Sequence, residues 1–294
     1  MGGVLAVVAV LALLPWLRPA GLPGLAGLAA PATSVANPPS PTVISPAPPL
    51  SSPRSSHTAT VLRDGKVLVV GGREGARYLA TAEMYDPATN RWTPAGGGLT
   101  ARTGHTATTM ANGTVLVVGG QSTDTSYTAN AERYDPATNS WTSAGTLTDG
   151  RISHSATLLP NGQVLVAGGT TSSRRGTYLA TAERYDPATN SWSPAATMAG
   201  ARAGHSATLL PGGTVLVAGG QDGNTALAAA ETYDPGTNRW FPAAAMANGR
   251  WLHAAIPLPG GQVLVAGGLG AGSTALAAAE TYDPGANRWL SGAR

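Results

Sequence analysis

The chain has 294 residues, a formal net charge of +3 and no cysteine. The absence of cysteine excludes disulfides, thiolate catalysis and Cys-ligated metal sites, and it leaves the redox compartment open. The small net charge, without a Lys/Arg-rich run interleaved with aromatic residues, argues against nucleic acid as a partner. Hydrophobic residues make up 43% of the sequence, and the core is expected to consist of Val, Leu, Ala, Tyr and Trp.

The N-terminal part begins with an uncharged apolar run over residues 4–17. This run is short for a transmembrane helix and has the length of a signal-peptide core, although Arg18 follows it directly. Ser34 and Ala36 offer a cleavage site before Asn37. We therefore predict a signal peptide over residues 1–36 and a secreted, cell-surface or periplasmic protein; the alternative is an N-terminal membrane anchor formed by residues 4–17. Residues 37–53 are rich in Pro and Ser, which favours an extended linker.

From residue 54 to residue 294 the chain consists of five copies of one unit, each about 49 residues long. Every copy carries Arg-x-x-His, then a segment ending in Gly-Gly, then Ala-Glu-x-Tyr-Asp-Pro and Asn-x-Trp. The period is marked by the five histidines: His57, His105, His154, His205 and His253. Such spacing predicts a repeat architecture in which each unit packs against its neighbours.

Each unit is predicted to form four antiparallel strands. In the second unit, residues 105–110 and 115–118 are strand-like runs around Asn112-Gly113, a type I′ turn signal. A third strand is expected over residues 129–134, and a fourth begins near Trp141 after a turn that uses the Asp-Pro pair. Gly-Gly allows close backbone approach, and the repeated Tyr and Trp are expected to pack between units. A lone sheet cannot bury both faces, so this pattern favours a β-propeller.

The pattern Arg-x-x-His, Gly-Gly and Tyr-Asp-Pro-x-x-Asn-x-Trp resembles the kelch repeat over residues 54–294. The resemblance implies an all-β fold, a β-propeller of five four-stranded kelch-type blades, in a closed ring or in an incomplete, open one. Kelch propellers include protein-binding modules, carbohydrate-associated domains and a few oxidases. A galactose-oxidase-like copper enzyme would need a cysteine, and a sialidase-like hydrolase a Ser-x-Asp-x-Gly-x-Thr-Trp box; the chain has neither. We therefore predict no enzymatic activity and no cofactor.

The prediction of whether the ring is closed depends on how residues 42–49 are interpreted. Ile44 lies ten residues before Arg54, as Trp92 lies ten before Arg102, so this stretch resembles a degenerate fourth strand without a blade of its own. The favoured interpretation is five complete blades, with residues 42–49 running free as linker. The alternative is a further blade whose first three strands the chain lacks.

The arginine before the first strand of each unit is the first candidate ligand group. In a four-stranded meander it lies at the same end as the loop after Gly-Gly. A ring of guanidinium groups would suit carboxylates or sulfates, and its members are Arg54, Arg102, Arg151, Arg202 and Arg250. In the structural alternative, each arginine pairs with a repeated acid: Glu83, Glu132, Glu183, Glu231 or Glu280. The histidines are expected to form hydrogen bonds rather than to bind metal.

The loops after Gly-Gly vary between units, and function is expected where the repeats differ. The candidate ligand-binding residues in these loops are Arg73, Arg77, Tyr78, Gln121, Tyr127, Arg174, Arg175, Tyr178, Gln221 and Asp222. We predict a non-catalytic module that binds a protein or glycan, anionic in character, through the arginines and these loops. The alternatives are a purely structural surface protein and a galactose-oxidase-like enzyme, which the absence of cysteine disfavours.

Overall fold

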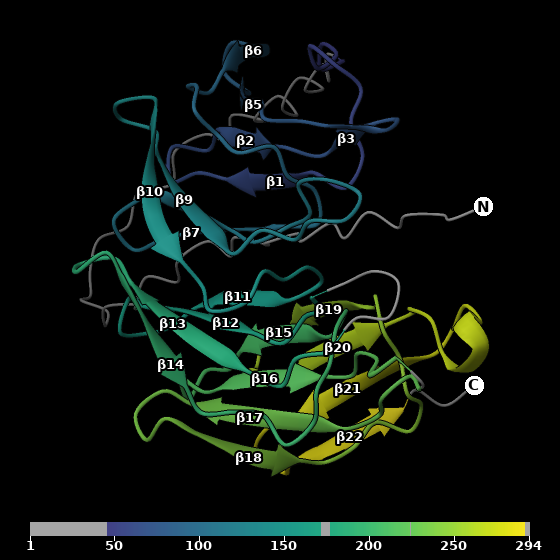
Figure 1. Ribbon diagram of the computed structural model, residues 1–294. Coiled ribbons are helices and arrows are strands. Elements are labelled where there is room, and N and C mark those ends of the chain that lie inside the picture. The colour runs from purple at the N-terminus through teal and green to yellow at the C-terminus, as the bar shows by residue number, and fades with distance from the viewer. Residues whose placement is uncertain (1–45, 172–176, 224, 292–294) are drawn as a thin grey trace, which may run out of the picture.

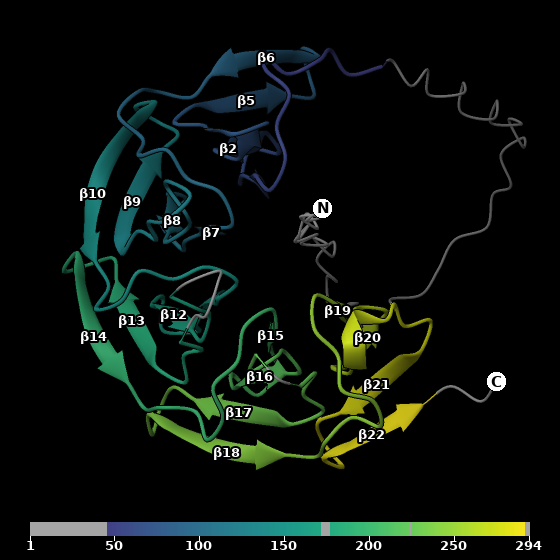
Figure 2. The ribbon, with the colours of Figure 1, turned by 45° about the vertical axis from the view of Figure 1, so that its right-hand side comes forward.

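The computed structural model describes residues 46–171, 177–223 and 225–291 as an all-β protein with five four-stranded antiparallel sheets. Figure 2 shows the sheets side by side around a ring, each with its fourth strand on the rim. The predicted propeller of five kelch-type blades is confirmed. Among the described residues, the ring is open between the first and fifth blades, as Figure 2 shows.

The strands follow the repeat units in order, and Figure 1 labels most of them. Blade 1 contains β1 (Thr58–Val61), β2 (Val67–Val70), β5 (Ala82–Asp86) and β6 (Arg91–Pro94). Blade 2 contains β7 (Thr106–Thr109), β8 (Val115–Val118), β9 (Asn130–Asp135) and β10 (Ser140–Thr146). Blade 3 contains β11 (Ser155–Leu158), β12 (Val164–Ala167), β13 (Ala182–Asp186) and β14 (Ser191–Ala195).

The last two blades repeat the same order of strands. Blade 4 contains β15 (Ser206–Leu209), β16 (Val215–Ala218), β17 (Ala230–Asp234) and β18 (Arg239–Ala243). Blade 5 contains β19 (Ala254–Pro257), β20 (Val263–Ala266), β21 (Ala279–Asp283) and β22 (Arg288–Ser291). The loops add a short ribbon and a single helical turn: β3 (Arg73–Glu74) with β4 (Arg77–Tyr78), and the 3-10 helix η1 (Ala271–Ser273).

The turns follow from the residues that each repeat places there. Gly113, in the hairpin between β7 and β8, has a φ of 87°, which glycine adopts without strain. Between the third and fourth strands, Asp135 accepts a hydrogen bond from the backbone N–H of Ala137 at 2.9 Å. Asn139 has a φ of 50° and accepts a hydrogen bond of 2.7 Å from the Tyr134 hydroxyl. The predicted role of the repeated Asp in the turn is confirmed.

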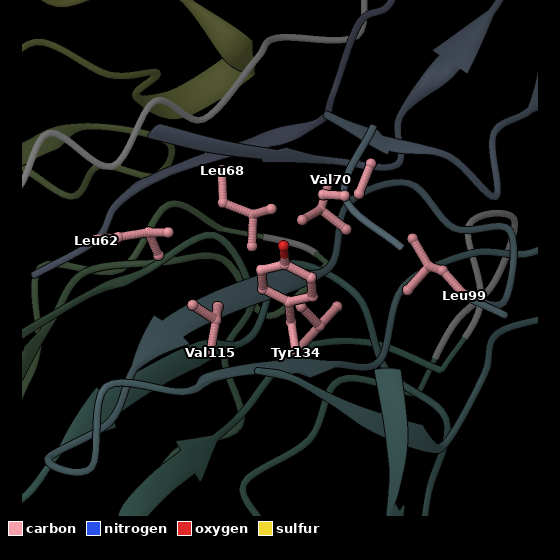
Figure 3. Packing of buried hydrophobic residues seen from close by; sticks show 9 residues of the cluster. Leu62, Leu68, Val70, Leu99, Val115 and Tyr134 are labelled. Carbon is pink, nitrogen blue, oxygen red and sulfur yellow. The ribbon is translucent and has the colours of Figure 1, made fainter. Parts of the chain in front are cut away.

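The hydrophobic core lies between neighbouring blades. Figure 3 shows Leu62 and Leu68 of blade 1 beside the Tyr134 ring of blade 2, which is fully buried. The Trp141 ring lies 5.0 Å from Tyr134, centroid to centroid, and its Nε1 donates to the Ala95 carbonyl of blade 1 at 2.8 Å. Equivalent clusters join blades 2 and 3, 3 and 4, and 4 and 5. The predicted packing of Tyr and Trp between units is confirmed.

Backbone hydrogen bonds also join each blade to the next at the Gly-Gly pair. The Gly72 N–H donates to the Arg102 carbonyl of blade 2 at 2.8 Å. A Cβ on Gly71 would lie only 2.6 Å from the same oxygen, so this approach requires glycine. The same bond to the arginine of the following blade is made by Gly120, Gly169 and Gly220.

Residues 46–53 pack on blade 1. The Pro48 carbonyl accepts a hydrogen bond from Trp92 Nε1 at 2.8 Å, and the Ser51 N–H donates to the Glu83 carboxylate at 3.0 Å. Blade 2 receives equivalent bonds from the residues that follow β6 of blade 1. Residues 46–53 thus make the contacts that the residues after the fourth strand of a preceding blade would make, although they form no strand themselves. This contact corrects the free-linker interpretation for residues 46–49, while residues 42–45 lie outside the described part.

The predicted export signal lies in a different part of the chain. The apolar run over residues 4–17 and the cleavage site before Asn37 are outside the described residues, so the signal peptide or anchor stays a prediction. Within the ranges that the structure describes, no helix has the length and apolar character needed to cross a membrane.

Candidate functional site: the loop face

The loops after Gly-Gly and the residues that follow each repeated arginine meet at one end of the propeller, which we call the loop face. Isolated β-bridges join the two segments in every blade: Ser55 to Arg73, Thr103 to Gln121, Ile152 to Thr170, Ala203 to Gln221 and Trp251 to Leu269. The Asp-Pro turns lie at the opposite end, because successive strands run in opposite directions. The predicted shared position of these two segments is confirmed.

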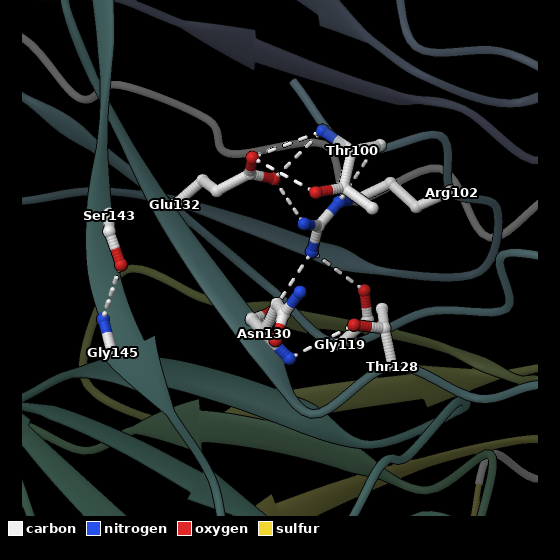
Figure 4. Close-up of polar contacts among 8 residues, drawn as sticks. All are labelled: Thr100, Arg102, Gly119, Thr128, Asn130, Glu132, Ser143 and Gly145. Carbon is white, nitrogen blue, oxygen red and sulfur yellow. Dashed lines mark hydrogen bonds and ion pairs between the residues drawn. The ribbon is translucent and has the colours of Figure 1, made fainter. Parts of the chain in front are cut away.

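The five repeated arginines are enclosed within their blades, each with no more than 1% of its side chain exposed. The Arg202 guanidinium donates to the Glu231 carboxylate at 2.6 Å and to the Gly219 carbonyl at 3.0 Å. Figure 4 shows the corresponding contacts of Arg102, including its ion pair with Glu132. The complete set of pairs is Arg54–Glu83, Arg102–Glu132, Arg151–Glu183, Arg202–Glu231 and Arg250–Glu280.

These contacts correct the expectation that the arginine ring binds a ligand. Burial lowers the pKa of Arg202, and the charge of Glu231 opposes that shift. Removing one member of such a buried pair leaves an uncompensated charge, at a cost of about 3–5 kcal/mol. The terminal Nη donors of all five arginines are used within the blade and the side chains are shielded from solvent, so the structural alternative describes them. The Nε atoms of Arg54, Arg151 and Arg250 are buried without a hydrogen-bond partner among the described residues.

The repeated histidines connect neighbouring blades. The Nε2 atom of His205 lies 2.9 Å from the Ser155 hydroxyl of blade 3, and the other pairs are His105 with Thr58, His154 with Thr106, and His253 with Ser206. Burial, followed by the charge of the nearby arginine, lowers the pKa of His205 to about 3, which keeps the ring neutral for this contact. Among the described residues, no group of three or more His, Asp or Glu side chains is placed to hold a metal ion.

The loops of blades 1 and 2 contact each other and carry exposed charge. The Arg73 guanidinium lies 5.3 Å from the centroid of the Tyr78 ring, and the Tyr78 hydroxyl donates to Asp124 of the blade 2 loop at 2.9 Å. The Arg77 side chain is 75% exposed and lies 4.0 Å from Glu74. An exposed ion pair of this kind contributes little to stability, so it would not compete strongly with a ligand for Arg77. The exposure of its side chain makes Arg77 accessible to that ligand.

The remaining predicted loop residues are held by local contacts. Their bridges are Gln121 with Tyr127, Thr170 with Tyr178, and Gln221 with Ala226. The Tyr178 ring packs on Gly223 of the next loop, where a Cβ would lie 2.6 Å from a ring carbon. Asp222 accepts a hydrogen bond from the Thr225 N–H at 2.9 Å. Arg174 and Arg175 lie outside the described residues.

The loop face also contains an aromatic residue that the sequence analysis missed. Trp251 is half-buried, and Leu252 beside it has a φ of +52°, a conformation that is uncommon for leucine. Every other unit has Ser or Gly at the position of Leu252. The Leu252 N–H donates to the Gly204 carbonyl at 2.8 Å. Trp251 could have been found because it is the one tryptophan in residues 54–294 outside the Asn-x-Trp position.

Two surface hollows lie away from the loop face. One, of about 300 Å³, is on the rim of blade 2 beside Trp141, and the other, of about 530 Å³, lies between the turns of blades 4 and 5, beside Pro211 and Pro284. Small-molecule sites are typically enclosed and lined by convergent polar groups. The loop-face residues are instead distributed over several blades, which suits a macromolecular ligand.

Comparisons with known proteins agree with this architecture. The family described as the Attractin/LZTR1 beta-propeller matches residues 40–232, a range that begins before Arg54. A solved structure titled "Structure of YjhT" matches with a TM-score of 0.64 and 17% sequence identity, over 82% of this chain and 84% of that one. At this identity the likeness concerns the fold alone. No curated protein is a significant match.

Proposed function

The chain belongs to the Attractin/LZTR1 β-propeller family, and we propose that this kelch-repeat protein is an exported, non-catalytic module that binds an anionic protein or glycan at its loop face. The observation that carries this proposal is the division of each repeat into a constant and a variable part. The buried Arg-Glu pairs and the His contacts recur from blade to blade, whereas the loops above them differ. A rigid scaffold with variable loops is the usual arrangement of a binding protein.

The chemistry of the loop face supports an anionic ligand. Arg77 is exposed, and Arg73 is held over Tyr78, so two guanidinium groups are available in one loop. Arginine grips carboxylate and sulfate groups with paired N–H donors. Tyr78 and Trp251 add aromatic surface of the kind that dominates binding energy at interfaces. The contact between Tyr78 and Asp124 orders two loops before a ligand arrives, which lowers the entropy cost of binding.

The non-catalytic part of the proposal rests on how the titratable groups are used. The histidines with the most depressed pKa values, near 3, lie in contacts between blades. The buried acids pair with the repeated arginines. Perturbed groups in such repeated structural contacts are weak indicators of an active site. Export rests on the apolar run over residues 4–17, and mass spectrometry of the protein from its native host should find an N-terminus between about residues 20 and 37.

The ligand proposal is tested by a double substitution in the blade 1 loop. Arg73→Ala with Arg77→Ala should reduce retention on a sulfated-glycan array and on an acidic-peptide array, and should flatten the salt dependence of binding. The matched control is Arg91→Ala, which removes an exposed arginine from the same blade at its opposite end. Unchanged retention in a folded double variant, or equal loss in the control, would contradict the proposal.

A further inference from the structure

The hollow of about 530 Å³ between blades 4 and 5 lies at the end of the propeller opposite the loop face, and we call it the turn pocket. Blade 4 contributes Thr232 of β17 and the hairpin turn that contains Pro211. Blade 5 contributes Tyr282 of β21 and the turn that contains Pro284 and Asn287. None of the described residues that line the turn pocket carries a charged side chain.

Thr232 occupies a position where the three preceding units have a long side chain. The strand register places Thr232 in one row with Leu216, which packs toward Tyr282, so Thr232 faces blade 5. The preceding units have Met84, Arg133 and Arg184 at this position. Threonine is several atoms shorter than methionine or arginine, so it leaves space beside the tyrosine of the next blade.

The interface between blades 3 and 4 offers a matched comparison, because it has almost the same residues around this point. The counterparts of Pro211, Tyr282 and Asn287 are of the same residue types: Pro160, Tyr233 and Asn238. The turns of blades 4 and 5 both continue with Pro-Gly after the repeated Asp. The residue that faces the tyrosine differs: it is Arg184 in blade 3 and Thr232 in blade 4.

Arg184 fills this space in the interface between blades 3 and 4. Its Nε atom is buried, and its guanidinium donates a hydrogen bond to the Tyr233 hydroxyl. Burial raises the pKa of Tyr233, and the charge of Arg184 opposes that shift. Arg133 makes the same contact with Tyr185 between blades 2 and 3. The space beside the repeated tyrosine therefore accommodates a guanidinium group in two interfaces of this chain.

Tyr282 has the same surroundings without the guanidinium. Its hydroxyl donates to Asn287 Oδ1 at 2.9 Å, as the Tyr233 hydroxyl donates to Asn238 Oδ1 at 2.8 Å. Within the described ranges, no group donates to the Tyr282 oxygen. Burial raises the pKa of Tyr282, and the charge of Asp283 adds to that shift. The pair of Asp283 with exposed Arg288, at 4.0 Å, is weak. An acceptor and a negative charge thus favour a cation in the turn pocket.

The rim of the turn pocket carries the single phenylalanine of the chain. Phe241 pairs with Thr232 across β17 and β18, so both side chains lie on the side that faces blade 5. Phe241 is 46% exposed, and its counterparts in blades 1 to 3 are Thr93, Thr142 and Ser193. An aromatic ring at this place suits a guanidinium group and the apolar residue next to it. This favours an arginine within a peptide over a free guanidinium ion.

We propose that the turn pocket binds the guanidinium group of an arginine side chain in a peptide segment of a partner protein. The arginine takes the place that Arg184 fills in the preceding interface and donates to the Tyr282 hydroxyl oxygen, while its neighbour in the peptide contacts Phe241. The site is separate from the loop face, so the propeller can hold a basic peptide at one end and an anionic ligand at the other.

The probe for this site is the tripeptide acetyl-Leu-Arg-Leu-amide, added to the full chain and followed by NMR through the backbone amide shifts. Shifts are expected at Gly261 and Gly285, with a Kd of about 1 mM. The same peptide with citrulline, the uncharged isostere of arginine, should bind roughly tenfold more weakly or worse.

Two matched variants locate the site. Thr232→Arg should weaken binding by roughly tenfold or more, because the chain's own arginine then fills the turn pocket. Thr281→Arg makes the same change at the corresponding position of blade 5, which faces away from blade 4, and should bind as the unmodified chain does. Arg184→Thr should empty the preceding interface and add a second site, with new shifts at Gly213 and Gly236.

Three results would overturn the proposal: equal binding of the arginine and citrulline peptides, unchanged binding by folded Thr232→Arg, or no shifts at Gly261 and Gly285. Equal affinity for the tripeptide and for free arginine amide would assign the turn pocket to a small guanidinium ligand and would also overturn it. The loop-face double substitution of Arg73 and Arg77 by Ala should leave this binding unchanged, which separates the outcome from that of the proposed function.

Discussion

Four interfaces between successive blades are sealed by packed side chains, whereas the position between blades 5 and 1 is open. Both are built from the same repeat, yet their side-chain packing, histidine contacts and backbone hydrogen bonds differ. At a sealed interface, leucine and alanine of one blade cover valine and tyrosine of the next, a histidine meets a hydroxyl, and a glycine N–H reaches an arginine carbonyl. At the open position, the counterparts of these groups have no neighbouring blade in the part of the chain that the structure describes. A blade is therefore stabilised largely by the apolar surface that its neighbours cover, as expected for repeat proteins.

The largest difference in the free energy of unfolding is expected between a charge placed in a sealed interface and the same charge placed on the face of blade 5 that borders the opening. Leu216→Arg puts a guanidinium into a sealed interface and should destabilise the chain by more than about 4 kcal/mol. Val263 and Val265 of β20 pack against blade 4, so Leu264 between them faces the opening and is partly exposed. Leu264→Arg makes the same change there, where the charge can reach water, and should cost less than about 1 kcal/mol. Urea denaturation of both variants measures the difference. Equal losses of stability would mean that the open position is sealed in solution.

A smaller difference in stability is expected for substitutions of the first glycine of the Gly-Gly pair, which precedes the glycine that bonds to the next blade. Gly219→Ala and Gly267→Ala both introduce a Cβ at positive φ, which costs about 1–2 kcal/mol. Only at Gly219 would the Cβ also meet the Arg250 carbonyl of the next blade, which should add about 1–3 kcal/mol of steric strain. Thermal unfolding of the two variants tests this order. A greater loss at Gly267 would contradict the assignment of the opening.

Acid should weaken the sealed interfaces through their histidines. Burial lowers the pKa of His205 from 6.5 to about 3, so the unfolded chain binds more protons between these values. Stability is therefore fully present above about pH 6.5 and falls as the pH drops toward 3, by up to about 1.4 kcal/mol per pH unit for each such ring. His57 lies beside the opening and is only half-buried, so it contributes less to this pH dependence of stability.

The measurement is the free energy of unfolding in urea at several pH values between 8 and 5. His205→Gln should reduce its pH dependence, and the matched variant His57→Gln should leave most of it in place. A stability that does not change with pH over this range would contradict the neutral, buried state of the sealed histidines.

Most of the fold could be predicted because the repeat encodes it locally. The Asn112-Gly113 turn, the Asp135 turn and the Gly-Gly approach each depend on the backbone preferences of a few adjacent residues. The position of residues 46–49 could not be settled in this way. Their match to an outer strand was visible in the sequence, but their hydrogen bond to Trp92 is a contact between residues 44 positions apart.

The candidate site was less predictable than the fold. A ring of arginines is compatible with both ligand binding and internal pairing, and only the burial of Arg202 beside Glu231 distinguishes the two. That burial arises from the packing of neighbouring blades, which no local pattern encodes. The uncovered face of blade 5 could not be predicted for the same reason: Ala254 and Ile256 are ordinary strand residues, and only the structure shows that no described blade covers them.

Amide hydrogen exchange at Gly220 and Gly268 tests the open position most directly. The Gly220 N–H is bonded to the Arg250 carbonyl, whereas the Gly268 N–H has no acceptor among the described residues. The purified chain alone should therefore show strong protection at Gly220 and exchange that is roughly a hundredfold faster or more at Gly268. Equal protection of the two amides would show that the ring is closed in solution, and it would contradict this account.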